Sequence, residues 1–160
     1  MKNNCINRLD FALSAISENE SVARSLVAVA VSTLDPTLEE LADVRCAVSE
    51  AVTNAIVHGY KNGAVREGKR EGRVYISVRL YKDRSVLIEV RDKGVGIADV
   101  ARAREPLYTT DESGERSGMG FAVMEAFTDR VRVSSRVGHG TRVTLLKRLS
   151  VQGKTEEADM

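Results

Sequence analysis

The sequence predicts an α+β fold of two layers, in which helices lie on one face of a mixed, mostly antiparallel sheet. Apolar residues recur at helical spacing over two early stretches, residues 18–34 and 36–58. Later stretches alternate apolar and polar residues around short turns, as the strands of hairpins do. The predicted order is a strand, two helices, two strands, a glycine-rich excursion, a helix and two strands. This order favours helices layered on a sheet.

The first strand is predicted where Leu9, Phe11 and Leu13 alternate with other residues. Residues 17–20, Ser-Glu-Asn-Glu, offer a capping box, so a helix should begin there and run to about Leu34. The apolar stripe of this helix comprises Val22, Ala23, Leu26, Val27, Val29, Ala30 and Thr33.

The second helix is predicted to begin at Asp35 and Pro36, because aspartate suits an N-cap and proline suits the first helical position. It should run to about His58, where Gly59 is a plausible stop.

The second helix carries an unusual polar face. Glu50, Asn54 and His58 recur every four residues, so they stack along one side of the helix. A carboxylate can accept a proton, and an amide oxygen can ligate a hard cation. This face could therefore hold a base and a metal ligand together, although a solvated polar face is the alternative for the helix taken alone.

The rest of the chain predicts a loop and six further elements. The loop over residues 61–73 is basic and glycine-rich and should be mobile. The elements are a hairpin of strands over 74–80 and 86–90, a short helical piece over 100–104, a helix over 121–127, and a closing hairpin with strands near 131–133 and 143–149.

Length and composition bound the function. At 160 residues we expect one domain over residues 1–150 and a frayed tail over residues 151–160. The 24 basic and 23 acidic residues leave the chain with almost no net charge, which disfavours direct binding to nucleic acid or an anionic membrane. No apolar run could span a bilayer and no signal-peptide core follows the N-terminus, so the chain is expected in the cytoplasm. Cys5 and Cys46 are too few for a disulfide framework or a zinc site.

Two further motifs follow the polar helix face. Asp92, Gly94 and Gly96 come directly after a predicted strand, and Gly118 and Gly120 open the third predicted helix. Glycines at the start of a helix favour an anion site. Each motif alone also fits an ordinary turn, so the specific signal is the joint occurrence of the two motifs with the polar helix face.

These three motifs, in this order, resemble the N, G1 and G2 boxes of the GHKL (Bergerat-fold) ATPases, which include gyrase, histidine kinases and MutL. The stretches 49–60, 107–110 and 115–121 are also similar to the sporulation anti-sigma factors of endospore formers, which are serine kinases of that family. The resemblance covers roughly residues 9–149 and has two departures: a longer basic loop, and Asp111 in place of a basic residue.

The resemblance implies ATP or ADP as the nucleotide and Mg²⁺ as the metal. By resemblance, Glu50 would be the general base that takes the proton of the attacking hydroxyl, and Asn54 would ligate Mg²⁺. Asp92 would accept a hydrogen bond from the exocyclic amine of adenine. Gly94 and Gly96 would let the backbone pass close to the base.

The same resemblance implies that Gly118, Met119 and Gly120 offer backbone N–H groups to the phosphates. Thr141 matches the family threonine that lies near the adenine, often through water. Arg116 would stabilise the transferring phosphate or contact the protein substrate; a surface ion pair with the preceding glutamate is the alternative.

The resemblance implies an anti-sigma factor that binds a sporulation sigma factor (sigma-F) and, as an ATP-dependent serine kinase, phosphorylates the anti-anti-sigma antagonist, a STAS-domain protein. Arg24 lies off the apolar stripe and should point to solvent; it aligns with the family's sigma-contacting arginine. A homodimer in the forespore is also implied. His58 is not a phospho-acceptor, because the acceptor of histidine kinases lies on a separate dimerisation helix.

Two alternatives stay open. One is a nucleotide-dependent sigma-binding module without kinase activity, which the intact Glu50 disfavours because a pure binder needs no base. The other is a related stress-switch kinase with different partners.

Overall fold

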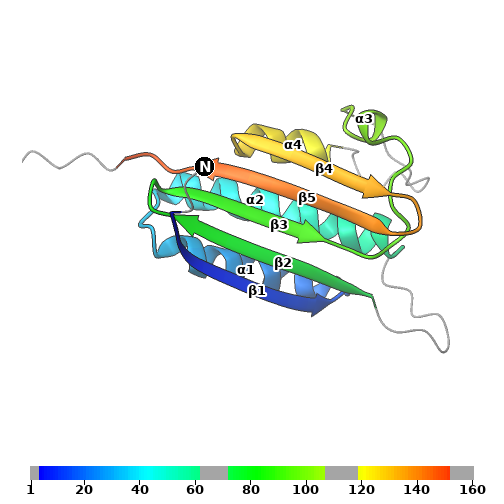
Figure 1. The fold of residues 1–160 in the computed structure, drawn as a ribbon, viewed down its shortest axis with the longest axis horizontal. Coiled ribbons are helices and arrows are strands. Elements are labelled where there is room, and N and C mark those ends of the chain that lie inside the picture. The colour runs from blue at the N-terminus through cyan, green and yellow to red at the C-terminus, as the bar shows by residue number, and fades with distance from the viewer. Residues whose placement is uncertain (1–3, 62–71, 107–118, 152–160) are drawn as a thin grey trace, which may run out of the picture.

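A computed structural model describes residues 4–61, 72–106 and 119–151. The strands are β1 (Cys5–Ser14), β2 (Arg73–Tyr81), β3 (Ser85–Arg91), β4 (Arg130–Arg136) and β5 (Gly140–Arg148). The helices are α1 (Glu18–Ser32), α2 (Leu38–Asn54), the π-helical turn η1 (Ala55–Gly59), α3 (Val100–Ala103) and α4 (Gly120–Phe127). In Figure 1, α1, α2 and α4 lie on one face of the sheet, with α2 between the other two. The predicted α+β, two-layer fold is confirmed.

The sheet has the strand order β1-β2-β3-β5-β4, and each pairing among the described strands is antiparallel. The sequence predicted a mostly antiparallel sheet. The alternation that predicted the first hairpin is seen directly, because Val74, Ile76, Val78 and Leu80 are all buried on the helical side. The core lies between this face of the sheet and the helices.

The capping box predicted for α1 is wrong. Among the described residues, no backbone N–H donates to the side chain of Ser17. The box needs Glu20, but the Glu20 carboxylate instead accepts hydrogen bonds from the Ser49 hydroxyl of α2 and from Arg24, at 3.2 Å. A tertiary contact between two helices has replaced the local cap.

The apolar stripe of α1 was predicted too wide. Its buried residues are Ala23, Val27, Ala30 and Val31. Val22, Leu26 and Val29 remain 42%, 40% and 68% exposed, so they lie beside the contact with the sheet and α2 rather than in it. The buried stripe of α1 is therefore narrower than the apolar set, and position on the helix, not size, decides which residues are buried.

The start of α2 also differs from the prediction. Thr37, not Asp35, is the N-cap: its hydroxyl accepts from the Glu40 N–H at 3.1 Å, and the Glu40 carboxylate accepts from the Thr37 N–H at 2.9 Å. Asp35 has a φ of 52° and belongs to the preceding turn. The capping box therefore exists, but at the second helix.

The end of α2 widens into the π-helical turn η1, where a continuous α-helix to His58 was expected. The Tyr60 N–H donates to the Ala55 carbonyl, five residues back, at 3.0 Å. Gly59 ends the helix as predicted. This turn brings Gly59 against the end of β3, where the Asp92 motif begins.

Arg84 joins three segments on the edge of the fold. It occupies the left-handed region, with a φ of 69°, in the β2–β3 turn. Its guanidinium donates to the carbonyls of Leu34 at 2.7 Å, Asp35 at 3.1 Å and Ser150 at 2.9 Å. One side chain thus ties the α1–α2 connection to the chain that follows β5.

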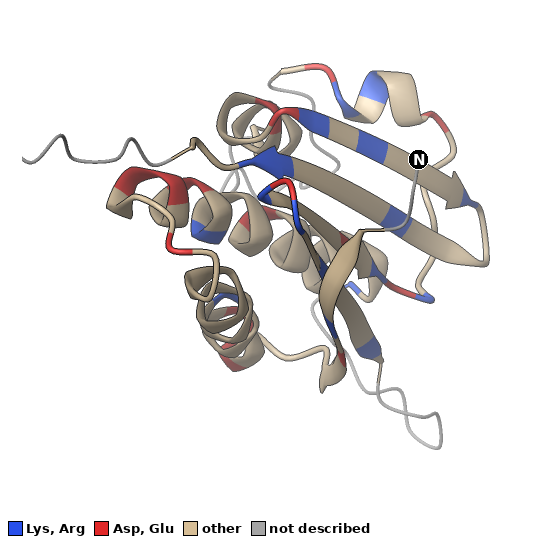
Figure 2. Cartoon of the chain, turned by 60° about the vertical axis from the view of Figure 1, so that its left-hand side comes forward, with Lys and Arg blue, Asp and Glu red and all other residues tan. Residues whose placement is uncertain are grey.

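Charges are locally segregated although the whole chain is nearly neutral. Figure 2 colours the cartoon by charge, with acidic residues at one end of a helix and basic residues along the strands. The residues are Glu39 and Glu40 on α2, and Arg130, Arg132, Arg136, Arg142, Lys147 and Arg148 on β4 and β5. No helix within the described ranges is long and apolar enough to cross a membrane. The predicted basic loop falls largely on residues 62–71, and the predicted tail on residues 152–160, which both lie outside the described residues.

Candidate nucleotide site

The end of α2 and the start of α4 meet at the polar face of α2. A Cβ built on Gly120 would lie 3.2 Å from the Glu50 Oε2 and 3.2 Å from the Asn54 Nδ2. Gly120 is the first residue of α4, so the unpaired N–H groups of that helix begin beside a carboxylate and an amide. Two of the three predicted motifs are therefore brought into contact.

Asp92 lies directly after β3 and is only 5% exposed. Its Oδ1 accepts from the Gly94 N–H at 2.9 Å, and its own N–H donates to the Thr141 carbonyl at 2.9 Å. Burial raises the pKa of the Asp92 carboxyl, and the N–H groups of Gly94 and Thr141 oppose that rise. The second carboxylate oxygen is thus a buried acceptor at the end of the strand.

The glycines around Asp92 allow close backbone approach. A Cβ on Gly94 would lie 2.0 Å from the Gly59 carbonyl oxygen, and a Cβ on Gly59 would lie 2.9 Å from the Asp92 Cγ. The Val95 N–H donates to the same Gly59 carbonyl at 3.0 Å. Gly96 has a φ of 75°, a conformation that favours glycine. The Asp92 motif is therefore docked on the end of the polar helix.

Thr141 lies near Asp92, and its hydroxyl contacts a residue that the sequence analysis missed. The hydroxyl oxygens of Ser135 and Thr141 lie 2.8 Å apart, and the two residues are cross-strand partners of β4 and β5. Ser135 continues the alternation of Val131 and Val133 on the helical face of β4. That alternation was the signal that could have revealed it.

Tyr60 is a second residue that the sequence analysis missed. Its hydroxyl donates to the Arg73 carbonyl at 2.6 Å and accepts from the Lys93 N–H at 2.7 Å. Burial raises the pKa of this phenol, so it stays protonated and can donate at neutral pH. Tyr60 thus fixes the chain that follows Asp92, and only its position after the polar helix could have suggested such a role.

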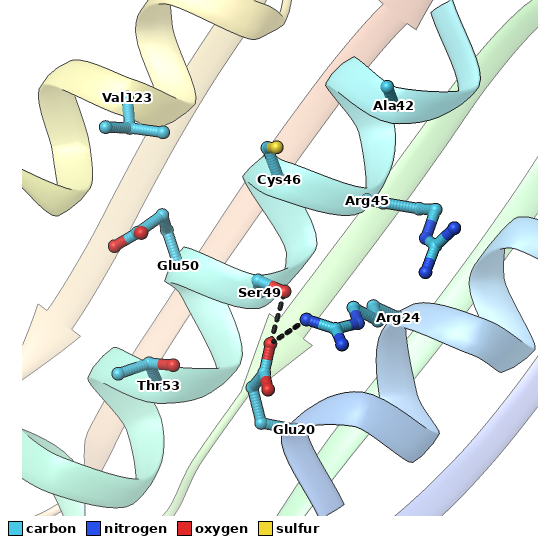
Figure 3. A pocket seen from close by; sticks show the side chains of 9 residues that line it. All are labelled: Glu20, Arg24, Ala42, Arg45, Cys46, Ser49, Glu50, Thr53 and Val123. Atoms are coloured by element: carbon cyan, nitrogen blue, oxygen red, sulfur yellow. Dashed lines mark hydrogen bonds and ion pairs between the residues drawn. The ribbon is translucent and has the colours of Figure 1, made fainter. Parts of the chain in front are cut away.

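A hollow of about 550 Å³ lies between α1, α2 and α4, next to Glu50 (Figure 3). Its lining residues are Glu20, Arg24, Ala42, Arg45, Cys46, Ser49, Glu50, Thr53 and Val123. Arg24 was expected to point to solvent, but it pairs with Glu20 and lines this hollow, with 37% of its side chain exposed. The hollow brings the guanidinium groups of Arg24 and Arg45 together with the carboxylates of Glu20 and Glu50.

Some predicted site residues are not tested by the geometry. Met119 is the N-cap of α4, and its carbonyl accepts from the Val123 N–H at 2.9 Å. Arg116, Gly118 and residues 107–110 lie outside the described residues. His58 lies in the last turn of η1, one turn beyond Asn54.

The donor set fits a magnesium ion that is carried mainly by a nucleotide. No group of three or more His, Cys, Asp or Glu side chains in the described ranges could hold a metal alone. Mg²⁺ commonly takes one or two protein oxygens together with phosphates and water. The Asn54 amide, which lies beside Gly120 at the start of α4, could supply one such oxygen.

The chain is similar to known proteins of one family. Residues 13–147 match the family model of the histidine kinase-like ATPase domain. An anti-sigma F factor of Priestia megaterium is 49% identical over 144 residues, which are 90% of this chain and 94% of that protein. An anti-sigma F factor of Pasteuria penetrans is 51% identical over 143 residues, covering 89% of this chain and 91% of that protein.

Two solved structures are similar in fold. The RsbU and RsbW domains of a Mycobacterium tuberculosis protein superpose with a TM-score of 0.64 at 22% identity, over 92% of this chain and 34% of that chain. The histidine kinase domain of a blue-light activated kinase from Erythrobacter litoralis gives 0.52 at 18% identity, over 81% of this chain and 61% of that chain.

Proposed function

The chain belongs to the histidine kinase-like ATPase domain family and, within it, to the anti-sigma F factors, and from this we propose that it is an ATP-dependent protein serine kinase. Its substrate would be an anti-anti-sigma protein of the STAS type, and the same chain would bind and inhibit a sigma factor of the sigma-F type. The observation that carries the proposal is the contact of Gly120 with Glu50 and Asn54. The carboxylate proposed as the base and the amide proposed as the metal ligand thereby lie at the N-terminus of a helix, where phosphates bind favourably.

Glu50 is the proposed general base. It lies one helical turn before Asn54, so the two side chains share the face that α4 approaches. A carboxylate there can take the proton of a serine hydroxyl as that oxygen attacks the γ-phosphorus. Mg²⁺, held by Asn54 and the phosphates, would neutralise charge on the transferring group.

The phosphates are proposed to bind the backbone N–H groups of Gly118, Met119 and Gly120. The described start of α4 supports this for Met119 and Gly120, whose helix has unpaired N–H groups at that end. Arg116 precedes these glycines in sequence and is proposed to stabilise the transferring phosphate or to contact the protein substrate.

The adenine is proposed to bind at the other end of the site, against Asp92 and Thr141. A buried carboxylate oxygen accepts from an amine and repels a carbonyl, so it favours adenine over guanine. Gly94 and Gly96 are proposed to let the base lie against the backbone. The tight packing of Gly94 on η1 supports a rigid wall at that place.

The hollow between α1, α2 and α4 is the proposed approach for the protein partners. Its guanidinium groups, Arg24 and Arg45, would pair with acidic side chains of the partner, and Glu50 at its edge would meet the acceptor serine. A homodimer located in the forespore, with residues 1–150 as one domain, completes the proposal.

The test is transfer of labelled γ-phosphate from MgATP to the anti-anti-sigma protein. Glu50→Ala should reduce transfer by about 100-fold or more while ADP binding is retained, because the base acts on the acceptor hydroxyl. Glu39→Ala, an exposed glutamate at the start of the same helix, is the matched control. Undiminished transfer by Glu50→Ala would refute the base assignment. Nucleotide binding by the native chain without transfer would favour a sigma-binding module.

A further inference from the structure

Three side chains form a row across the end of the sheet, on the face that the helices cover. Thr141 is the cross-strand partner of Ser135, and the Thr141 carbonyl accepts from the Asp92 N–H at 2.9 Å. The two-residue alternation of strands puts all three on the inward face: Ser135 in β4, Thr141 in β5, and Asp92 just after β3. The row therefore joins Ser135 to the proposed adenine end of the site.

The Ser135 hydroxyl has three polar neighbours. It accepts from the Ile97 N–H at 2.7 Å, it donates to the Gly140 carbonyl at 3.0 Å, and its oxygen lies 2.8 Å from the Thr141 hydroxyl oxygen. A serine hydroxyl has one proton and two acceptor lone pairs. The carbonyl of Gly140 can only accept, so the Ser135 proton is used there.

Either hydroxyl oxygen could donate in this pair, but all three contacts of Ser135 are hydrogen bonds at the same time only if the Thr141 proton makes this one. In that arrangement Ser135 accepts on both lone pairs, one from Ile97 and one from Thr141. Thr141 has no second proton to donate. It can offer only lone pairs to a ligand, and it stands beside a carboxylate, Asp92, that is also an acceptor.

We propose that Ser135 is a positioning residue that makes the nucleotide site selective for purines with an amino group at C6. The proposal rests on the proposed function, in which Asp92 and Thr141 face the base. With the Thr141 proton held by Ser135, both residues accept, so they match the two hydrogens of a 6-amino group directly or through a water. A 6-oxo purine presents a carbonyl oxygen to the same two acceptors and is rejected.

Ser135 acts through Thr141 and need not touch the nucleotide. Without the Ser135 hydroxyl, the Thr141 hydroxyl can rotate and donate to a 6-oxo group. The preference for a 6-amino purine should then fall by about three- to tenfold, which corresponds to one neutral hydrogen bond. The repulsion from Asp92 remains, so part of the preference should remain.

The experiment is calorimetric binding of ADP and of inosine diphosphate, each with magnesium. The native protein should prefer ADP, and Ser135→Ala should lower the ratio of the two dissociation constants by about three- to tenfold. Ser135→Thr, which keeps a hydroxyl, should restore the native ratio. Ser134→Ala, a neighbouring exposed serine, is the matched control and should leave the ratio unchanged.

A double-mutant cycle separates positioning from a general loosening of the strands. Thr141→Val should itself lower the ratio, and adding Ser135→Ala to it should change the ratio no further. If Ser135→Ala does not fold, Thr141→Val alone tests the proposal. An unchanged ratio of the two dissociation constants in the Thr141→Val protein overturns it. Equal weakening of both nucleotides by Ser135→Ala also overturns it, with the proposed function intact. Failure of the native protein to bind ADP overturns the proposed function and this inference together.

Discussion

Replacement of Asp92 by asparagine should weaken ADP binding without lowering the stability of the fold. The Asp92 Oδ1 accepts from the Gly94 N–H, and the side-chain amide oxygen of the Asp92→Asn variant can keep that bond. The amide nitrogen then takes the place of the second carboxylate oxygen. A donor replaces an acceptor at the place where the adenine amine is proposed to bind.

The magnitude follows from the bond that is lost. A hydrogen bond to a charged acceptor contributes about 1.5–3 kcal/mol, and about 1.4 kcal/mol is tenfold in affinity. ADP binding should therefore weaken by at least about 10- to 100-fold. Stability should not fall, because burial raises the pKa of the Asp92 carboxyl, so the fold disfavours its charge.

The pH dependence of stability has a definite sign. Burial raises the pKa of Asp92 in the folded state, so the stability from the protonated carboxyl is present below the unfolded pKa, near pH 4. It is lost as the pH rises through the higher folded pKa. The Asp92→Asn protein should therefore gain in stability relative to the native protein as the pH rises from about 4.

The assays are ADP calorimetry and thermal unfolding between about pH 4 and pH 8, the range over which the carboxyl ionises. Asp83→Asn is the matched control, because the Asp83 Oδ1 also accepts a backbone N–H two residues on, from Ser85 at 3.0 Å, but it is exposed in the β2–β3 turn. Asp83→Asn should bind ADP normally. Normal ADP binding by Asp92→Asn, or a large loss of its stability at neutral pH, would refute the reasoning.

Two further predictions concern the scaffold. Gly94→Ala places a Cβ 2.0 Å from a backbone oxygen of Gly59, so it should destabilise the fold by about 3 kcal/mol in urea unfolding or abolish ADP binding. Gly138→Ala is the control. Its Cβ would meet no atom in the described structure, and its φ of 79° should cost only about 1 kcal/mol. Arg84→Ala removes three hydrogen bonds to backbone carbonyls and should lower the free energy of unfolding by about 2 kcal/mol. Arg84→Gly should lower it less, because glycine adopts the left-handed backbone at this position without strain. Equal stability of the native and Arg84→Ala proteins would contradict this prediction.

The layered fold could be predicted from sequence because it depends on local spacing, whereas the grouping of the three motifs was expected only from the resemblance to the GHKL ATPases. The four-residue repeat of Glu50 and Asn54 fixes their common face on any helix. Period-two alternation likewise fixed the face of each strand in the hairpins. The contact between Gly120 and the polar face, which joins two elements far apart in sequence, needed the structure.

The errors arose where tertiary contacts compete with local signals. Ser17 and Glu20 have the spacing of a capping box, but Glu20 bonds Ser49 and Arg24 instead. The sequence showed no sign of the role proposed for Ser135, because that role depends on hydrogen bonds to three residues that are not adjacent to it in sequence. Such roles depend on packing between elements, which spacing within one element does not report.

The most direct test of the nucleotide site is the map of amide chemical shifts in isotopically labelled protein titrated with MgADP. The described geometry predicts saturable shifts at Asp92 and Gly94, at Thr141, and where α4 begins at Gly120 beside Asn54. Shifts confined to the hollow between α1, α2 and α4, or no saturable shift at millimolar ADP, would contradict a nucleotide site organised around the polar face of α2.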